Sequence, residues 1–180
     1  VCENLNIDVV SLAANRNVKL MEQQIRQFKP KVAAMFDEEA AKALETAVKD
    51  TDTKVLKGLE GIKEAVVHKD ADTVLTSVVG ISGLIPTMTA IEAGKNIALA
   101  NKETLVTAGH LVMKAVKEKG VRLFPVDSEH SAVFQCLQGN RKEDVSKIIL
   151  TASGGPFRGY TREQLKSVTV KQALNHPNWS

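Results

Sequence analysis

Apolar and polar residues follow two regular patterns along this chain. Short apolar runs, the first over 7–13, have the length and composition of buried strands. Longer segments carry apolar residues at helical spacing, as over 18–28, where they stand at positions 18, 20, 21, 25 and 28. Polar turns, glycines and Pro30 separate these segments, and Asp37 stands where it can cap the next helix.

The two patterns alternate through residue 126. Strands are predicted over 7–13, 31–36, 53–57, 72–79, 96–100 and 121–126, and helices over 18–28, 38–49, 59–68, 84–93 and 104–119. Gly94 and Gly120 follow the last two helices as C-caps. This alternation predicts parallel strands with right-handed crossovers, and therefore an α/β fold with a Rossmann-like, doubly wound parallel sheet.

Composition narrows the classes of protein that fit this pattern. The 180 residues are 43% hydrophobic, and the net charge of +3 comes from basic residues spread along the chain. This balance suits a small anionic substrate and does not indicate nucleic-acid binding. Cys2 and Cys136 lie too far apart for a metal motif or a disulfide framework, which favours a reducing compartment, and we expect Cys136 to be buried. No apolar run is long enough to span a bilayer, and no signal-peptide pattern occurs.

A cluster of polar residues follows the apolar run 121–126. Asp127 and Glu129 are two residues apart at the end of a predicted strand, where their carboxylates can converge on one hard cation. The alternative is a helix cap, in which Asp127 or Ser128 accepts hydrogen bonds from the first turn of the helix predicted to follow. We expect His130 to support the acids.

The polar turn after the first apolar run suggests a cofactor. The glycine-rich phosphate-binding turn that usually marks this fold is missing, so the run 7–13 would be the second strand of the fold. Asn15, Arg16 and Asn17 would then lie where a cofactor's ribose and 2′-phosphate bind, and an arginine there favours the phosphorylated nicotinamide cofactor. An ordinary surface turn is the alternative.

The last part of the chain offers two further candidates. An apolar run over 148–150, interpreted as a strand, breaks into the Ser-Gly-Gly of 153–155, which is either a phosphate cradle or a flexible turn. His176 and Trp179 stand together near the end, where they belong either to a lid over a ligand or to the packed domain. Because the sequence starts at Val1 and stops without a closing element, we expect a piece of a longer protein.

Four segments, taken in order, resemble the 1-deoxy-D-xylulose 5-phosphate reductoisomerase family, and the resemblance covers essentially the whole chain. They are ALANKETLV (98–106), PVDSEHSAVFQ (125–135), LTASGGPFR (150–158) and HPNWS (176–180). The resemblance implies rearrangement and reduction of 1-deoxy-D-xylulose 5-phosphate to 2-C-methyl-D-erythritol 4-phosphate, with NADPH and Mg²⁺ or Mn²⁺. This is a step of non-mevalonate isoprenoid biosynthesis, and fosmidomycin inhibits the family.

The resemblance also implies a role for individual residues. The catalytic residues would be Lys102, Asp127 and Glu129, with Asp127 and Glu129 as metal ligands. The substrate would contact Ser128, Glu129, Ser153 and His176, and the cofactor would contact Asn15, Arg16, Asn17, Asn101 and Glu103. The family commonly has glycine at the position of Asn15 and lysine at that of Arg16, and arginine keeps the charge.

The resemblance implies a domain division as well. Residues 1–126 would form the NADPH-binding Rossmann-like domain, without its first strand and its GxTGxxG turn. Residues 127–180 would begin an α+β catalytic domain that includes the substrate lid. Further phosphate and metal ligands would lie downstream, so we expect this piece alone to be inactive. The parent protein would be a homodimer, with a bacterial cytoplasm favoured over a plastid. The alternatives are another NAD(P)-dependent dehydrogenase and a non-enzymatic binding module.

Overall fold

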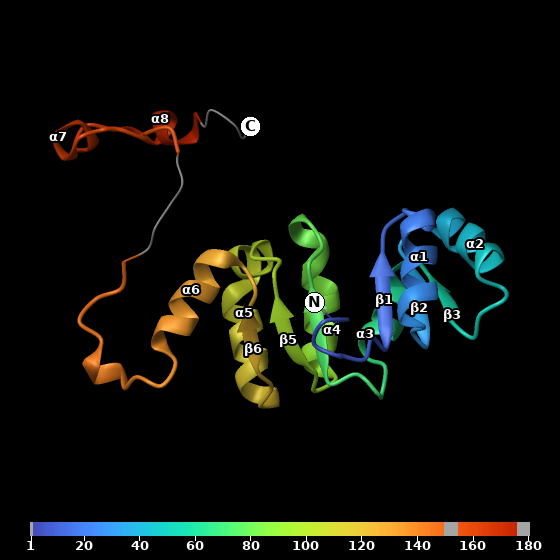
Figure 1. Cartoon of the computed structure of the whole chain (residues 1–180). Coiled ribbons are helices and arrows are strands. Elements are labelled where there is room, and N and C mark those ends of the chain that lie inside the picture. The colour runs from blue at the N-terminus through green and yellow to red at the C-terminus, as the bar shows by residue number, and fades with distance from the viewer. Residues whose placement is uncertain (1, 150–154, 176–180) are drawn as a thin grey trace. The chain divides into compact units, whose positions relative to one another are not determined.

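Parallel strands joined by helices make up the N-terminal part of the structure (Figure 1). The computed structural model describes residues 2–149 and 155–175. The chain divides into two units, Val1–Ser131 and Ala132–Ser180, and the candidate site described below lies within the first. Among the described residues, no helix has the length and apolar content needed to cross a membrane.

The first unit contains two three-stranded parallel sheets. One sheet has the order β1-β2-β3, formed by Ser11–Ala14, Val32–Met35 and Lys54–Lys57. The other has the order β4-β5-β6, formed by Thr73–Thr76, Asn96–Leu99 and Leu123–Pro125. The connecting helices are α1 (Val18–Phe28), α2 (Glu38–Ala47), α3 (Gly58–Val66), α4 (Leu84–Glu92) and α5 (Glu103–Lys119). The predicted α/β alternation is confirmed, and helix α1 has the predicted bounds.

Strand β2 is buried along its whole length because helices cover both of its faces. Ala33 and Met35 pack in a cluster with Met21 and Ile25 of α1 and Leu44 of α2. The alternate residues of the strand pack on the other face in a cluster with residues of β3 and α3, whose members are Val32, Ala34, Leu56, Ile62 and Ala65. A strand covered on both faces is typical of parallel sheets with helical crossovers.

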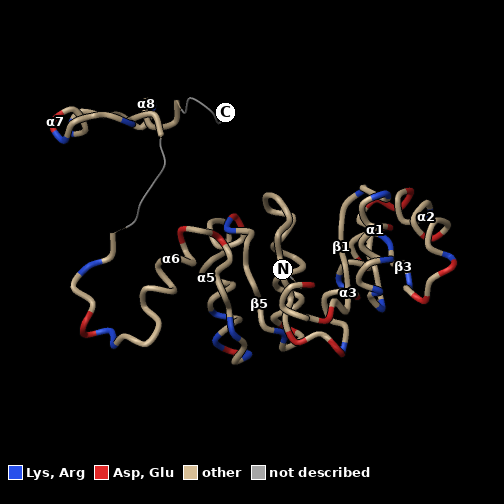
Figure 2. The backbone as a smooth tube through the Cα atoms, viewed as in Figure 1, with Lys and Arg blue, Asp and Glu red and all other residues tan. Residues whose placement is uncertain are grey.

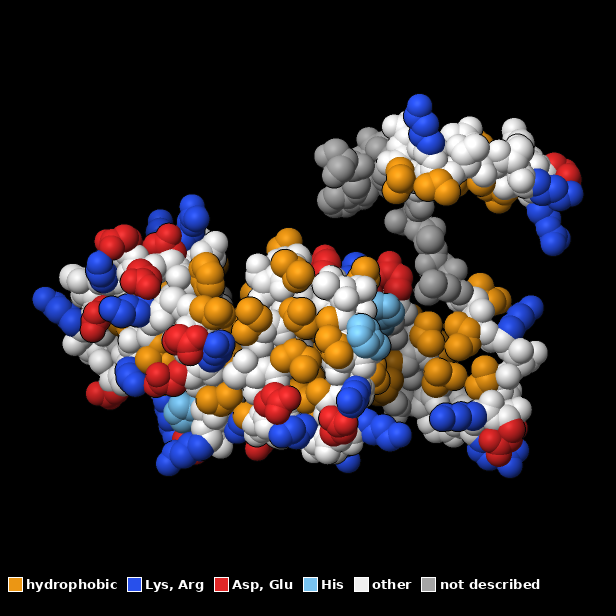
Figure 3. Space-filling model, turned by 180° about the vertical axis from the view of Figure 1, so that it is seen from behind, with side chains coloured by type: hydrophobic (Ala, Val, Ile, Leu, Met, Phe, Trp, Pro, Cys, Tyr) orange, Lys and Arg blue, Asp and Glu red, His pale blue; other side chains and the backbone are white. Residues whose placement is uncertain are grey.

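Strands β1 and β4 are each paired on one side only within the described residues. Leu75, in the middle of β4, is 60% exposed, although the strands of parallel sheets are normally buried. Apolar side chains are visible over much of the surface seen in Figure 3. Within the described residues, the predicted sheet is therefore formed as two separate three-stranded sheets. Strands β1 and β4 each have an unpaired edge to which a further strand can pair.

Helix α2 begins at the predicted cap. Asp37 has extended backbone angles, and its Oδ1 accepts a hydrogen bond of 2.9 Å from the backbone N–H of Ala40. We expect Asp37→Ala to lower the stability of this region by about 1 kcal/mol, because the Ala40 amide loses its acceptor. Asp37→Ser restores a capping oxygen and should recover most of that loss. Amide hydrogen exchange across α2 measures both effects, and equal protection in the two variants would contradict the capping role.

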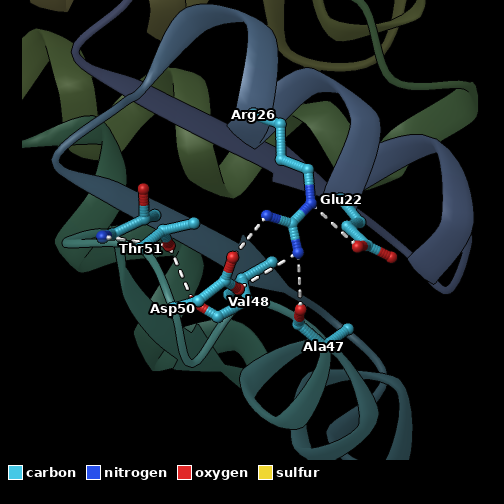
Figure 4. Close-up of polar contacts among 7 residues, drawn as sticks. Glu22, Arg26, Ala47, Val48, Asp50 and Thr51 are labelled. Atoms are coloured by element: carbon cyan, nitrogen blue, oxygen red, sulfur yellow. Dashed lines mark hydrogen bonds and ion pairs between the residues drawn. The ribbon is translucent and has the colours of Figure 1, made fainter.

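Arg26 links the C-terminal end of α1 to the end of α2 and the turn that follows it (Figure 4). Its Nη1 and Nη2 lie 2.8 and 3.1 Å from the two carboxylate oxygens of Asp50, and Nη2 also donates to the carbonyl of Ala47 at 3.0 Å. Its Nε donates to Glu22, one turn earlier on α1. The hydrogen bonds from Arg26 lower the pKa of Asp50, so this link weakens as the pH falls through that lowered value.

The second unit has no helix with a buried side chain among its described residues. Helix α6 (Ser128–Leu137) begins in the first unit, and η2 (Lys142–Asp144), α7 (Arg162–Leu165) and α8 (Val170–Leu174) follow. The strand predicted over 148–150 is wrong for its described residues, since 148–149 form no strand and are exposed. Cys136 is likewise exposed, not buried as predicted. Both errors have one cause, because no described layer packs against these apolar residues.

Candidate active site

Lys102 and Asp127 meet at the carboxyl ends of two neighbouring strands. Strands β5 and β6 are parallel partners, with Leu99 opposite Pro125 at their ends, so the segments that follow them lie side by side. The Nζ of Lys102 lies 2.7 Å from Oδ2 of Asp127. The Asp127 side chain is only 9% exposed, whereas that of Lys102 is about half exposed. The fold thus brings together an acid and a base that are 25 residues apart in sequence.

The surroundings of Asp127 favour its ionised form. The hydrogen bond from Lys102 is the largest effect that lowers the pKa of Asp127, and the same contact raises the pKa of Lys102. The backbone N–H of His130 approaches Oδ1 of Asp127 at 3.5 Å, and the ring Nδ1 of His130 is at the same distance. The contact that resembles a helix cap is therefore long, and the shortest contact of this carboxylate is the hydrogen bond from Lys102.

Ser128 and Glu129, which follow Asp127, add oxygen atoms that could bind a metal ion. The hydroxyl of Ser128 donates to Oε2 of Glu129 at 2.8 Å, and a hydrogen bond with Glu129 also helps to lower the pKa of Asp127. Two carboxylates and a hydroxyl are the kind of ligand that Mg²⁺ and Mn²⁺ prefer. Within the described ranges, no group of three or more His, Cys, Asp or Glu side chains could hold a metal ion. The donor chemistry fits a hard cation, but two carboxylates are a partial ligand set.

Asn101 lies at the junction of β5 and α5 and is 2% exposed. Its Nδ2 donates to the carbonyls of Val78 and Gly80 at 2.7 and 2.9 Å, and to Oε2 of Glu103 at 2.9 Å. The hydroxyl of Thr104 donates to its Oδ1. Every polar atom of the Asn101 side chain is thus engaged within the protein, and Glu103 is exposed beside it.

Asn15, Arg16 and Asn17 are exposed at the carboxyl end of β1. The side chain of Asn17 caps α1, since its Oδ1 accepts from the backbone N–H of Leu20 at 3.1 Å. Arg16 forms neither an ion pair nor a side-chain hydrogen bond with any residue that the structure describes. Basic and acidic residues are interspersed along the backbone (Figure 2).

The predicted substrate residues Ser153 and His176 lie outside the described residues, as does Trp179. Their predicted roles therefore stay predictions. The structure adds a group that sequence reasoning missed, around Thr76 and the segment that follows β4. Thr76 is buried, and its hydroxyl has no hydrogen-bond partner in the described part of the chain. A threonine that ends an apolar run just before the glycines of SVVGISG was the available signal.

Parallel α/β sheets with polar residues at the carboxyl ends of their strands define the doubly wound class of ligand-binding proteins. The profile for 1-deoxy-D-xylulose 5-phosphate reductoisomerase matches residues 1–109, and that for the C-terminal domain of the same enzyme matches residues 123–180. The chain therefore belongs to the 1-deoxy-D-xylulose 5-phosphate reductoisomerase family. This membership sets aside the alternative of another NAD(P)-dependent dehydrogenase.

Individual relatives agree with this assignment. The chain is 61% identical to the 1-deoxy-D-xylulose 5-phosphate reductoisomerase of Acetivibrio thermocellus, over 100% of the chain and 47% of that protein. A structure of the enzyme from Zymomonas mobilis in complex with NADPH matches with 39% identity and a TM-score of 0.80, over 96% of this chain and 46% of that one. A structure of the reductoisomerase with NADPH, fosmidomycin and magnesium matches with 37% identity and a TM-score of 0.75, over 96% of this chain and 45% of that one. The chain thus spans slightly less than half of its relatives.

Proposed function

We propose that the full-length protein converts 1-deoxy-D-xylulose 5-phosphate to 2-C-methyl-D-erythritol 4-phosphate, using NADPH and Mg²⁺ or Mn²⁺, in non-mevalonate isoprenoid biosynthesis. The observation that carries the proposal is the Lys102–Asp127 pair, with Ser128 and Glu129 beside it, at the carboxyl ends of β5 and β6. Relatives that match 100% and 96% of this chain support it. Because the chain spans about half of those relatives, we propose that it is inactive alone.

The acids of this centre would hold the cation and the substrate. Asp127 and Glu129 would be metal ligands, completed by groups outside the described residues. When bound, the cation acts as a Lewis acid that polarises the substrate ketone. Lys102 keeps Asp127 ionised through their hydrogen bond and can orient an anionic substrate, and Ser128 adds a hydroxyl to the substrate side. Ser153 and His176 would contact the substrate phosphate, and Trp179 would belong to the lid.

The cofactor would lie along the carboxyl ends of the strands, with Asn15, Arg16, Asn17, Asn101 and Glu103 on its side of the site. The complex of a relative with NADPH supports the identity of this cofactor. In a Rossmann-like fold the end of the second strand is where an acidic or basic side chain distinguishes the 2′-hydroxyl from the 2′-phosphate. Arg16 is exposed and has no partner in the described chain, so its guanidinium is available to an anion.

Arg16→Gln in the full-length protein should weaken NADPH binding by about 10- to 100-fold, because a charge-assisted contact to the phosphate is lost. NADH binding should change little, so the preference between the two cofactors should shrink by the same factor. Arg122→Gln is the matched control, since it removes one exposed positive charge before the start of β6, at the opposite end of the strands. Equal effects of both variants on NADPH would mean that only net charge matters.

The remaining parts of the proposal concern the whole protein. We place the boundary between the NADPH-binding domain and the catalytic domain after residue 126, and the two separate profile matches, over 1–109 and 123–180, support a division in this part of the chain. The parent protein would be a homodimer that acts in a bacterial cytoplasm. The reaction itself is tested by ³¹P NMR of the full-length protein with substrate, NADPH and Mn²⁺. The substrate resonance should be replaced by that of the branched polyol phosphate, and oxidation of NADPH without this product would refute the proposed reaction.

A further inference from the structure

The carboxylate of Asp127 is shared between two neighbours. Its Oδ2 accepts a hydrogen bond of 2.7 Å from the Nζ of Lys102, the residue just before α5. Its Oδ1 faces the first turn of α6, where the backbone N–H and the ring Nδ1 of His130 each lie 3.5 Å away. Hydrogen bonds from nitrogen donors are typically about 2.7–3.2 Å long, so Lys102 makes the shortest contact of this carboxylate.

The ammonium of Lys102 is held in a way that allows it to leave. The Lys102 side chain is about half exposed, whereas that of Asp127 is nearly buried. Within the part of the chain that the structure describes, Nζ of Lys102 donates its one hydrogen bond to Asp127. A lysine carries its charge at the end of a flexible chain of four carbons. Release would therefore move the ammonium into water, while Asp127 stays where it is.

The proposed cation would bind the same carboxylate as Lys102. The hydroxyl of Ser128, which donates to Oε2 of Glu129 at 2.8 Å, is neutral and can stay beside a bound cation. The ammonium of Lys102 carries a full positive charge, and like charges gathered at one carboxylate repel each other. A nearly buried carboxylate has little water around it to screen this repulsion. Lys102 and a divalent cation are thus competitors for Asp127.

We propose that Lys102 and the divalent cation bind Asp127 in alternation, so that cation binding frees the Lys102 ammonium for the anionic substrate. The inference rests on the proposed function and adds an exchange of partners to it. Lys102 then couples the two binding events, because a substrate that takes up the ammonium leaves Asp127 open to the cation. By linkage, each ligand strengthens the binding of the other by the same factor.

Titration of the full-length protein with Mn²⁺, without substrate, tests the competition directly. Lys102→Met should bind Mn²⁺ about three- to tenfold more tightly than the wild type, because the competing charge is gone and the apolar stem is kept. Lys102→Arg should bind Mn²⁺ more weakly than the wild type, because a guanidinium can hold both oxygens of a carboxylate. A residue that merely supports a metal ligand predicts the opposite for Lys102→Met, a loss of roughly 10- to 100-fold.

Lys54→Met is the matched control for this series. Lys54 also donates to a carboxylate, that of Glu64 at 2.8 Å, and it lies at the amino end of β3. The substitution makes the same change in net charge and should leave Mn²⁺ affinity unchanged. Equal tightening in Lys54→Met and Lys102→Met would mean that net charge alone sets the affinity, and would refute the competition.

A measurement on the wild-type protein keeps the test decisive if the variants fold poorly. Reductive methylation of lysines, followed by mass spectrometry of peptides, reports how readily each amine reacts. Saturation with Mn²⁺ should increase the modification of Lys102 several-fold, because the amine loses its carboxylate partner. The modification of Lys54 should not change.

Two further results would overturn the inference. Weaker or unchanged Mn²⁺ binding by Lys102→Met would show that Lys102 does not compete with the cation. Unchanged modification of Lys102 at saturating Mn²⁺ would show that its ammonium stays on Asp127. Failure of the proposed function is a different result, since a wild-type protein that binds no Mn²⁺ refutes the cation assignment together with this inference. A wild-type protein that binds Mn²⁺ but gives either of the first two results refutes the exchange alone.

Discussion

Asp127→Asn in the full-length protein is expected to reduce turnover by at least about a hundredfold. Changing a residue that only supports a metal ligand typically costs roughly 10- to 100-fold, and Asp127 is proposed to be a ligand itself. The substitution keeps the shape of the side chain and removes the charge that pairs with Lys102 and would bind the cation. Affinity for Mn²⁺, measured directly by titration, should fall with turnover. The control is Asp144→Asn, which removes an exposed carboxylate of the second unit that Arg141 binds through two hydrogen bonds of 2.9 Å.

This variant separates the two interpretations of the acid cluster. Asparagine caps helices about as well as aspartate, so a helix cap would tolerate the change and turnover would persist. A metal ligand would not tolerate it. The lowered pKa of Asp127 provides a second test. The pairing with Lys102 stabilises the folded protein at neutral pH, and this contribution is lost as the pH falls through the lowered pKa. Asp127→Asn should therefore remove part of the acid sensitivity of this region.

Leu44→Ala should lower the stability of the first sheet by about 2–5 kcal/mol, which is typical when a fully buried leucine is truncated. Leu44 is 0% exposed and lies between α1 and β2, in the cluster that contains Met21, Ile25 and Met35. The residual cavity is the reason for the large effect, since helices α1 and α2 meet at this point. Hydrogen exchange of the slowest amides of β2, measured without cofactor, reports the loss of stability of this sheet separately from the other parts of the protein.

Leu20→Ala is the matched control for this substitution. Leu20 belongs to α1, and its side chain is 48% exposed, so its truncation should cost less than about 1 kcal/mol. Similar losses in the two variants would mean that the cluster around Leu44 is not the core of this sheet. A large loss for Leu20 alone would mean that another part of the full-length protein covers α1.

The local sequence pattern was sufficient to predict the helices of the first unit, whereas the bounds of the strands depend on the segments that pair with them. Val18–Phe28 and the cap at Asp37 follow from spacing and from one side chain. Strand β1 begins at Ser11, later than predicted, because pairing starts opposite Val32. Strand β4 ends at Thr76 because Asn101 binds the carbonyl of Val78 in place of a neighbouring strand. The exposed residues 148–149 show that apolar content alone does not specify a strand.

The site was predictable in residue type and less so in arrangement. The acids at 127 and 129 were expected from their position after a strand, and Lys102 entered only through resemblance to a family. Contact between Lys102 and Asp127 depends on β5 and β6 being neighbours, which no local pattern specifies. Asn101 stays a predicted cofactor contact, and the structure adds what the sequence cannot show, that its amide donates to the carbonyls of Val78 and Gly80.

The most direct test of the central claim is cofactor oxidation by the full-length protein. NADPH absorbance would be followed with 1-deoxy-D-xylulose 5-phosphate and Mn²⁺, with and without a chelator, alongside this 180-residue chain. We predict steady oxidation that requires the sugar phosphate, stops when the chelator is added, and is absent for the shorter chain. A folded full-length protein that binds NADPH and Mn²⁺ but oxidises no cofactor with this substrate would contradict the assignment of the Lys102–Asp127 centre.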